Sequence, residues 1–138
     1  MPYALLVAAL VALDQLVKHL VVQNIPLGHH VPFLPHILDL TYVQNTGAAF
    51  SLFAQHTWIL TLISLVMSVI LLLALVKKFF RHPLGRVCLA LLLAGALGNL
   101  IDRALQGYVV DMFNVLFMHF AVFNVADICV VVGGIGAA

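Results

Sequence analysis

Charged residues are scarce in this chain of 138 residues. Only 8% of its residues are charged, and none of the five acidic residues is a glutamate, whereas 64% of the residues are hydrophobic. Because soluble domains contain about 25% charged residues and about half apolar ones, this composition excludes a water-soluble globular domain. The net charge of +1 also argues against nucleic-acid binding, which requires a basic surface.

Cysteine is equally scarce. The two cysteines, Cys88 and Cys129, both lie in apolar stretches. Two separate thiols form neither a disulfide framework nor a metal site, and we interpret them as small packing residues. The chain contains no His-x-x-x-His or Cys-x-x-Cys pattern, so we expect neither a metal ion nor another cofactor.

Long apolar runs, by contrast, are abundant. One crossing of a bilayer takes about 20 mostly apolar residues, and the length of the chain leaves room for about four. These runs predict an all-α membrane protein that forms a single integral-membrane domain over residues 1–138. The expected transmembrane helices are residues 3–22, 58–76, 87–101 and 121–138.

The basic residues predict the orientation of these helices. The loop 77–86 holds four of the six Lys and Arg residues, whereas the segment 23–57 holds none. Cytoplasmic loops carry an excess of Lys and Arg, so we expect this loop and both termini to be cytoplasmic. Residues 23–57 and 102–120 then lie on the outer face.

The outer segments contain short β-like patterns. Residues 38–42 alternate apolar and polar side chains, which is typical of a half-exposed strand, and residues 108–110 form a second such run. Residues 45–47 read as a turn, and residues 48–54 as a short interfacial helix. We therefore expect a small sheet and a short helix on the outer face.

Polar residues within the expected spans are the most informative ones, because a charge in the bilayer usually faces the interior of the bundle and has a function. Asp14 and Lys18 are four residues apart on one helix. Their spacing favours a structural ion pair, with a direct role in substrate binding as the alternative. Asn99, Asp102 and Arg103 share one helical stripe, so Asp102 is expected to find its partners locally.

Three aspartates, Asp102, Asp111 and Asp127, are expected near one interface, with Asn124 on the same helix face as Asp127. Two close carboxylates do not both ionise at low cost, so one keeps its proton. Such a pair supplies a general acid and a general base. The aspartates therefore indicate an aspartyl hydrolase, with a small proton- or cation-coupled transporter as the alternative.

Five stretches taken together resemble lipoprotein signal peptidase, the bacterial signal peptidase II, over essentially the whole chain. Each stretch alone is a modest signal, but all five occur in order and on the expected sides of the membrane. They are residues 14–18, 45–50, 95–103, 107–111 and 123–127.

The resemblance implies an aspartyl endopeptidase of the bacterial inner membrane. It would cut prolipoproteins just before the diacylglyceryl-modified cysteine, with its active site toward the periplasm. The catalytic pair of the family corresponds to Asp111 and Asp127. The residues expected to support this pair or bind substrate are Asp14, Lys18, Asn45, Asn99, Asp102, Arg103 and Asn124.

The family also implies inhibition by the lipopeptide globomycin. The partners are then prolipoprotein substrates and membrane lipids, with no nucleic acid, and the protein is expected to be a monomer. Two features depart from the family pattern. Ile128 follows the second aspartate, where the family often has a small hydroxyl residue, and the basic tail that often follows the last span is absent.

Overall fold

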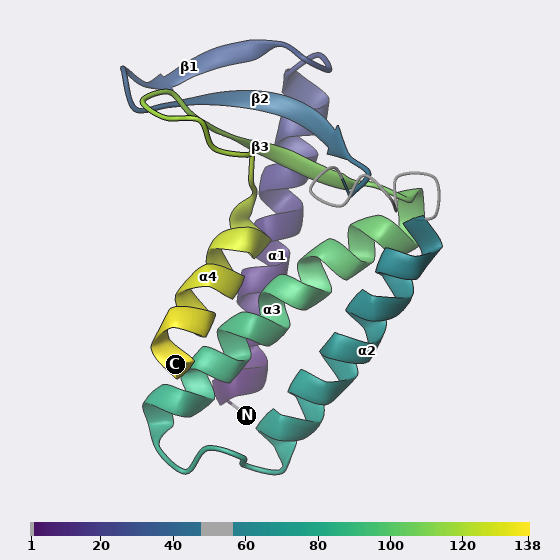
Figure 1. The fold of residues 1–138 in the computed structure, drawn as a ribbon, viewed down its shortest axis with the longest axis vertical. Helices are drawn as coiled ribbons and strands as arrows, with labels where there is room; N and C mark the ends of the chain where they lie inside the picture. The colour runs from purple at the N-terminus through teal and green to yellow at the C-terminus, as the bar shows by residue number, and fades with distance from the viewer. Residues whose placement is uncertain (1, 48–56) are drawn as a thin grey trace.

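A small sheet covers one end of a bundle of helices (Figure 1). The computed structural model describes residues 2–47 and 57–138. The interfacial helix expected over residues 48–54 therefore lies outside the described residues. Within them the chain forms four helices and three strands.

Three of the helices are long and apolar enough to cross a membrane. They are α1 (Pro2–Asn24), α2 (Thr57–Val76) and α3 (Pro83–Gln106). The fourth, α4 (Val125–Ala137), has 13 residues and rises only about 20 Å. It begins later than the expected residue 121, because Phe123 pairs with Phe113 of the sheet and Asn124 caps the helix.

The helix α3 extends beyond the expected range of 87–101 at both ends because both ends are capped. Pro83 occupies a first-turn position, and the side chain of His82 accepts a hydrogen bond from the Leu84 N–H. At the other end Gly107 adopts the left-handed conformation, with φ of 81°, and its N–H donates to the Arg103 carbonyl. Such a glycine is a common helix stop.

The sheet is antiparallel, with the strand order β1-β2-β3. Its strands are β1 (His30–Leu34), β2 (Leu38–Asn45) and β3 (Val109–Val115). The strand expected at 38–42 is thus confirmed and extends to Asn45. The strand expected at 108–110 is confirmed as well, but it begins one residue later and extends to Val115. Strand β1 was not expected, since it contains Pro32; it lies at the edge of the sheet, where a proline that lacks an N–H donor is tolerated.

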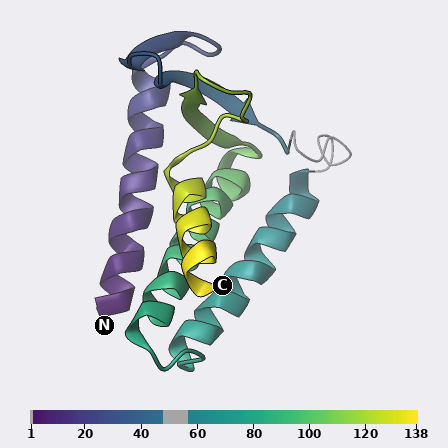
Figure 2. The same cartoon turned by 60° about the vertical axis from the view of Figure 1, so that its left-hand side comes forward.

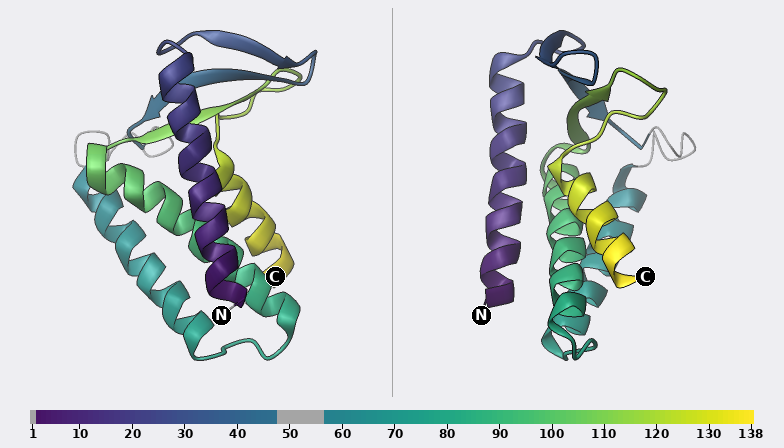
Figure 3. Two further views of the ribbon diagram at one scale, coloured as in Figure 1. Left: turned by 180° about the vertical axis from the view of Figure 1, so that it is seen from behind. Right: turned by 90° about the vertical axis from the view of Figure 1, so that its left-hand side faces the viewer.

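The helix α3 packs against each of the other three helices. The free ends of α1 and α4, and the loop between α2 and α3, lie toward the end of the bundle opposite the sheet (Figures 2 and 3). The two ends of the molecule therefore differ in character, with the sheet at one end and the basic loop at the other.

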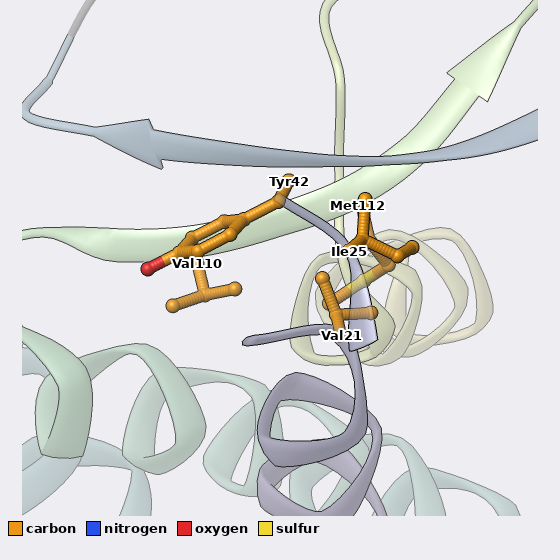
Figure 4. Packing of buried hydrophobic residues seen from close by; sticks show 5 residues of the cluster. All are labelled: Val21, Ile25, Tyr42, Val110 and Met112. Atoms are coloured by element: carbon orange, nitrogen blue, oxygen red, sulfur yellow. The ribbon is translucent and has the colours of Figure 1, made fainter. Parts of the chain in front are cut away.

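A buried cluster fixes the sheet on the end of α1. Val21 of α1 and Ile25, just after it, contact Tyr42 of β2 and Val110 and Met112 of β3. All five side chains are at most 8% exposed (Figure 4). Burying such side chains stabilises a fold by about 1.5–3 kcal/mol each. This contact orients β3 with respect to the helices.

Small residues allow α3 to approach α1 and α4 closely. A Cβ atom on Gly95 would lie 2.5 Å from the Ala126 carbonyl oxygen, and one on Gly98 would lie 2.5 Å from Asp14 Oδ2. Neither Gly95 nor Gly98 therefore has room for the methyl group of an alanine. Close backbone contact through small residues is a common packing mode of membrane helices, and here it brings the polar side chains of three helices together.

We predict that Gly98→Ala destabilises the protein by about 1–3 kcal/mol, because the new methyl group must displace the buried Asp14 carboxylate. Gly134→Ala is the matched control, since its Cβ would meet only Leu92 Cδ2 at 4.0 Å. Alanine also favours a helix over glycine, so this control should be neutral or slightly stabilising. Thermal unfolding in detergent measures both, and equal melting temperatures for the two variants would contradict the packing described here.

Candidate active site

The centre of the polar cluster is the ammonium group of Lys18, which is 3% exposed. Its Nζ lies 2.8 Å from Asp14 Oδ2 on the same helix and 3.0 Å from Asp102 Oδ2 on α3. The ion pair expected from the spacing of Asp14 and Lys18 is therefore confirmed. The second partner, Asp102, joins α1 to α3.

The carboxylates of Asp14 and Asp102 also accept hydrogen bonds from backbone N–H groups of α4 and β3. Asp14 Oδ1 accepts a hydrogen bond of 2.8 Å from the Ala126 N–H in the first turn of α4. Asp102 Oδ2 accepts one of 3.0 Å from the Val110 N–H in β3. One buried cation thus positions four elements, α1, α3, α4 and β3.

Gln15 completes this cluster, although sequence reasoning did not single it out. Its Nε2 donates to Asp102 Oδ1 and to the Gly98 carbonyl, both at 3.1 Å. Its place beside Asp14, within an apolar helix, was the signal in the sequence.

Asn99 connects the cation to the second half of the site. Its Oδ1 accepts hydrogen bonds from Lys18 Nζ at 3.1 Å and from Asn124 Nδ2 at 3.0 Å. Its Nδ2 donates to Asp127 Oδ1 at 3.0 Å. The amide of Asn99 is therefore oriented on one side by the buried ammonium and holds one oxygen of Asp127 on the other.

Asn124 is completely buried and contacts both proposed catalytic aspartates. As the N-cap of α4, its Oδ1 accepts the Asp127 N–H at 2.8 Å, and its own N–H donates to Asp127 Oδ2 at 3.2 Å. Its Nδ2 donates to Asp111 Oδ1 at 2.8 Å. The reciprocal capping bonds fix Asp127. Because Asn124 also binds Asp111, the two aspartates lie close together although they are 16 residues apart in the sequence.

Asp111 lies in β3 and is 1% exposed. Its Oδ2 accepts a hydrogen bond of 3.0 Å from Asn45 Nδ2 at the end of β2. Asn45 Oδ1 in turn accepts the Gly47 N–H at 2.8 Å, which agrees with the turn expected at residues 45–47. Burial, and secondarily the charge of Asp127, raise the pKa of Asp111 from 3.8 to about 6, although the hydrogen bonds from Asn45 and Asn124 oppose the shift.

The side chain of Arg103 reaches α2. Its Nη1 donates to Ser64 Oγ of α2 at 2.7 Å. The expectation that Asp102 finds its partners locally is wrong, since Asp102 contacts Lys18 and Gln15 of α1 and Val110 of β3. Helical spacing places Asn99, Asp102 and Arg103 near one another but does not determine which neighbouring helix each side chain reaches.

The arrangement suits acid–base chemistry between two carboxyl groups. Asp111 is enclosed, whereas Asp127 is partly exposed and lies in the first turn of a helix, where the helix dipole favours negative charge. Two identical groups in different environments divide the roles of acid and base. Within residues 2–47 and 57–138, no group of three His, Cys, Asp or Glu side chains is placed to hold a metal ion.

The chain is similar to known proteins over most of its length. The family model for signal peptidase (SPase) II matches residues 6–138. A lipoprotein signal peptidase of Enterococcus faecalis is 47% identical over 131 residues, covering 95% of this chain and 81% of the relative. One of Brevibacillus brevis is 36% identical over 131 residues, covering 95% of this chain and 88% of the relative.

The fold is also similar to solved structures. A bacterial membrane enzyme solved at 2.3 Å by the in meso method superposes with a TM-score of 0.82 and 32% identity, covering 98% of this chain and 84% of the other. A second, at 1.9 Å, gives a TM-score of 0.80 with 32% identity, covering 98% and 88%.

The raised pKa of Asp111 makes folding depend on pH. Below pH 3.8 the carboxyl is protonated in both states and contributes nothing; between pH 3.8 and about 6 only the unfolded chain releases its proton, so stability falls as pH rises. Asp111→Asn removes this penalty. We predict that the variant gains stability relative to the parent protein by up to about 3 kcal/mol between pH 4 and pH 7. Melting temperatures in detergent test this, and a constant offset over that range would contradict it.

Proposed function

The chain belongs to the signal peptidase II family, and we propose that it removes signal peptides from prolipoproteins by cutting just before the diacylglyceryl-modified cysteine. The observation that carries the proposal is the pair Asp111 and Asp127, held by the side chain and backbone of Asn124. Transport, the alternative that clustered aspartates also allow, is not supported by the relatives.

In the proposed reaction, Asp127 acts as the base and Asp111 as the acid. Asp127, at the positive end of the α4 dipole, takes a proton from a water molecule, which adds to the carbonyl carbon before the modified cysteine. Asp111, whose raised pKa favours the protonated form, donates a hydrogen bond to the developing oxyanion. The leaving amine then takes a proton from the pair.

The supporting residues divide into three proposed tasks. Asn45, Asn99 and Asn124 donate hydrogen bonds to the two carboxylates and so hold them in reacting positions. Asp14, Lys18 and Asp102 fix the elements on which the pair lies. Arg103, at the outer end of α3, is proposed to bind the substrate backbone.

The proposed setting is the bacterial inner membrane, with residues 1–138 as one catalytic domain that crosses it four times. The loop between α2 and α3 carries Lys77, Lys78 and Arg81, and Arg86 follows in the first turns of α3. These four basic residues support cytoplasmic termini and a periplasmic sheet and active site. The substrate's acyl chains would lie in the surrounding lipid. As in the family, we expect globomycin to inhibit the enzyme and the monomer to be active.

We predict that Asp111→Asn and Asp127→Asn each reduce the initial rate of cleavage, per folded enzyme, by at least about 10³-fold. The double variant should be scarcely slower than either, because groups that act as a unit are not additive. Asp102→Asn should instead lower the yield of folded protein, since it removes one partner of Lys18, while leaving measurable turnover.

The matched control is Asp39→Asn, which removes a carboxylate of β2 that contacts His30, outside the polar cluster, and should leave the rate unchanged. The measurement is cleavage of a lipid-modified precursor, with folded enzyme quantified separately. An active Asp111→Asn variant beside an inactive but folded Asp102→Asn variant would show that a different pair performs the reaction.

The proposed orientation is tested by labelling with a membrane-impermeant thiol reagent. In a variant without Cys88 and Cys129, a cysteine replacing the exposed His29, beside β1, should react in intact spheroplasts. A cysteine replacing Arg81, in the loop after α2, should react only after the membrane is broken. The reverse result would invert the proposed orientation.

A further inference from the structure

A groove of about 950 Å³ lies between α1 and α2, outside the proposed catalytic site. Its walls come from α1, between Tyr3 and Gln15, and from α2, with Leu93 and Leu97 of α3 between them. Both α1 and α2 pack against α3, which is why a space remains between them. Except at its ends, the groove is lined by apolar side chains.

The end of the groove away from the sheet is basic. Lys78, after α2, and Arg86, in the first turns of α3, line the groove there beside Tyr3. Among the described residues that line it, none is acidic. The hydrogen bond from Arg86 Nε to the Phe80 carbonyl, at 3.1 Å, uses one of the five N–H donors of the guanidinium. This end therefore suits a negatively charged group.

The lining of the groove suits acyl chains. Between its basic end and Gln15 the walls are apolar side chains of α1, α2 and α3, and α1 rises about 18 Å from Tyr3 to Gln15. Flexible hydrocarbon chains can lie along an apolar groove of this length.

The charge of the groove also argues against a signal peptide. The segment that precedes the apolar region of a signal peptide is positively charged. At the Lys78 and Arg86 end this segment would meet two further positive charges. A lipid phosphate at the same place is attracted, and basic pockets between transmembrane helices are known to bind anionic head groups.

We propose that this groove binds one anionic phospholipid from the leaflet on the side of the chain termini. The phosphate lies between Lys78 and Arg86, and the acyl chains run along the apolar groove toward Gln15. The proposal concerns binding alone. It does not depend on the catalytic roles of the aspartates, whereas the argument against a signal peptide rests on the orientation proposed above.

The test uses the whole enzyme in detergent, with native mass spectrometry to count bound phosphatidylglycerol and phosphatidylcholine from an equimolar mixture. We expect one bound phosphatidylglycerol in preference to phosphatidylcholine. Lys78→Gln and Arg86→Gln should each reduce this preference about fivefold. The matched control is Lys77→Gln with Arg81→Gln, which removes two charges from the same loop at positions that do not line the groove and should leave the preference unchanged.

Two outcomes would overturn the proposal. One is an equal loss of preference in the control and in the Lys78 and Arg86 variants, which would mean nonspecific attraction to the basic loop. Lys78→Gln guards against misfolding, since Lys78 is exposed in the loop after α2. The other is given by Ala8→Phe, which narrows the groove. It should lower phospholipid binding and leave the KM for precursor cleavage unchanged, whereas a KM raised about tenfold would make the groove a signal-peptide site.

Discussion

The buried ammonium of Lys18 is the constraint on which the arrangement of the site depends. A charge of this kind is costly in an apolar interior unless it is paired and hydrogen-bonded, and Lys18 has carboxylate partners at 2.8 and 3.0 Å. Each of those carboxylates also accepts a backbone N–H, from Ala126 of α4 or from Val110 of β3. The requirement to satisfy one cation therefore fixes the two elements that carry the proposed catalytic aspartates. Removing either carboxylate would leave the buried ammonium with a single charged partner and a backbone N–H without its acceptor, a larger cost than the loss of a surface ion pair.

Two asparagine side chains connect this cation to the proposed catalytic aspartates. Asn99 accepts from Lys18 and donates to Asp127, and Asn124 caps α4 and donates to Asp111. An amide is suited to this position because it donates and accepts at once, so it transmits orientation without adding charge. The result is an asymmetric pair. Asp111 is enclosed and its pKa is raised to about 6, whereas Asp127 receives hydrogen bonds at the start of a helix.

The parts of this fold that depend on local pattern could be predicted from the sequence. The hydropathy of the chain located the helices, alternation located β2, and the four-residue spacing of Asp14 and Lys18 predicted their ion pair. The contacts between distant segments could not be predicted, because they depend on which helix or strand packs against a given side chain. Spacing grouped Asp102 with Arg103, but the first contacts Lys18 and the second contacts Ser64. Likewise, α4 begins at Val125 because Phe123 pairs with the sheet, a contact between distant segments that local pattern does not reveal.

The polar cluster lies where the helices meet the sheet, and physical reasons favour that position. Cap residues and strand ends supply backbone donors that the middle of an apolar helix does not offer, and the Ala126 and Val110 N–H groups are of this kind. Glycines 95 and 98 then let the backbones approach closely enough for the side chains to meet. A bond next to a lipid-bearing cysteine must be cut where the acyl chains still reach the bilayer, and a junction between membrane helices and a covering sheet meets that requirement. The middle of a helix, without free backbone donors, would bury the same aspartates at a greater cost.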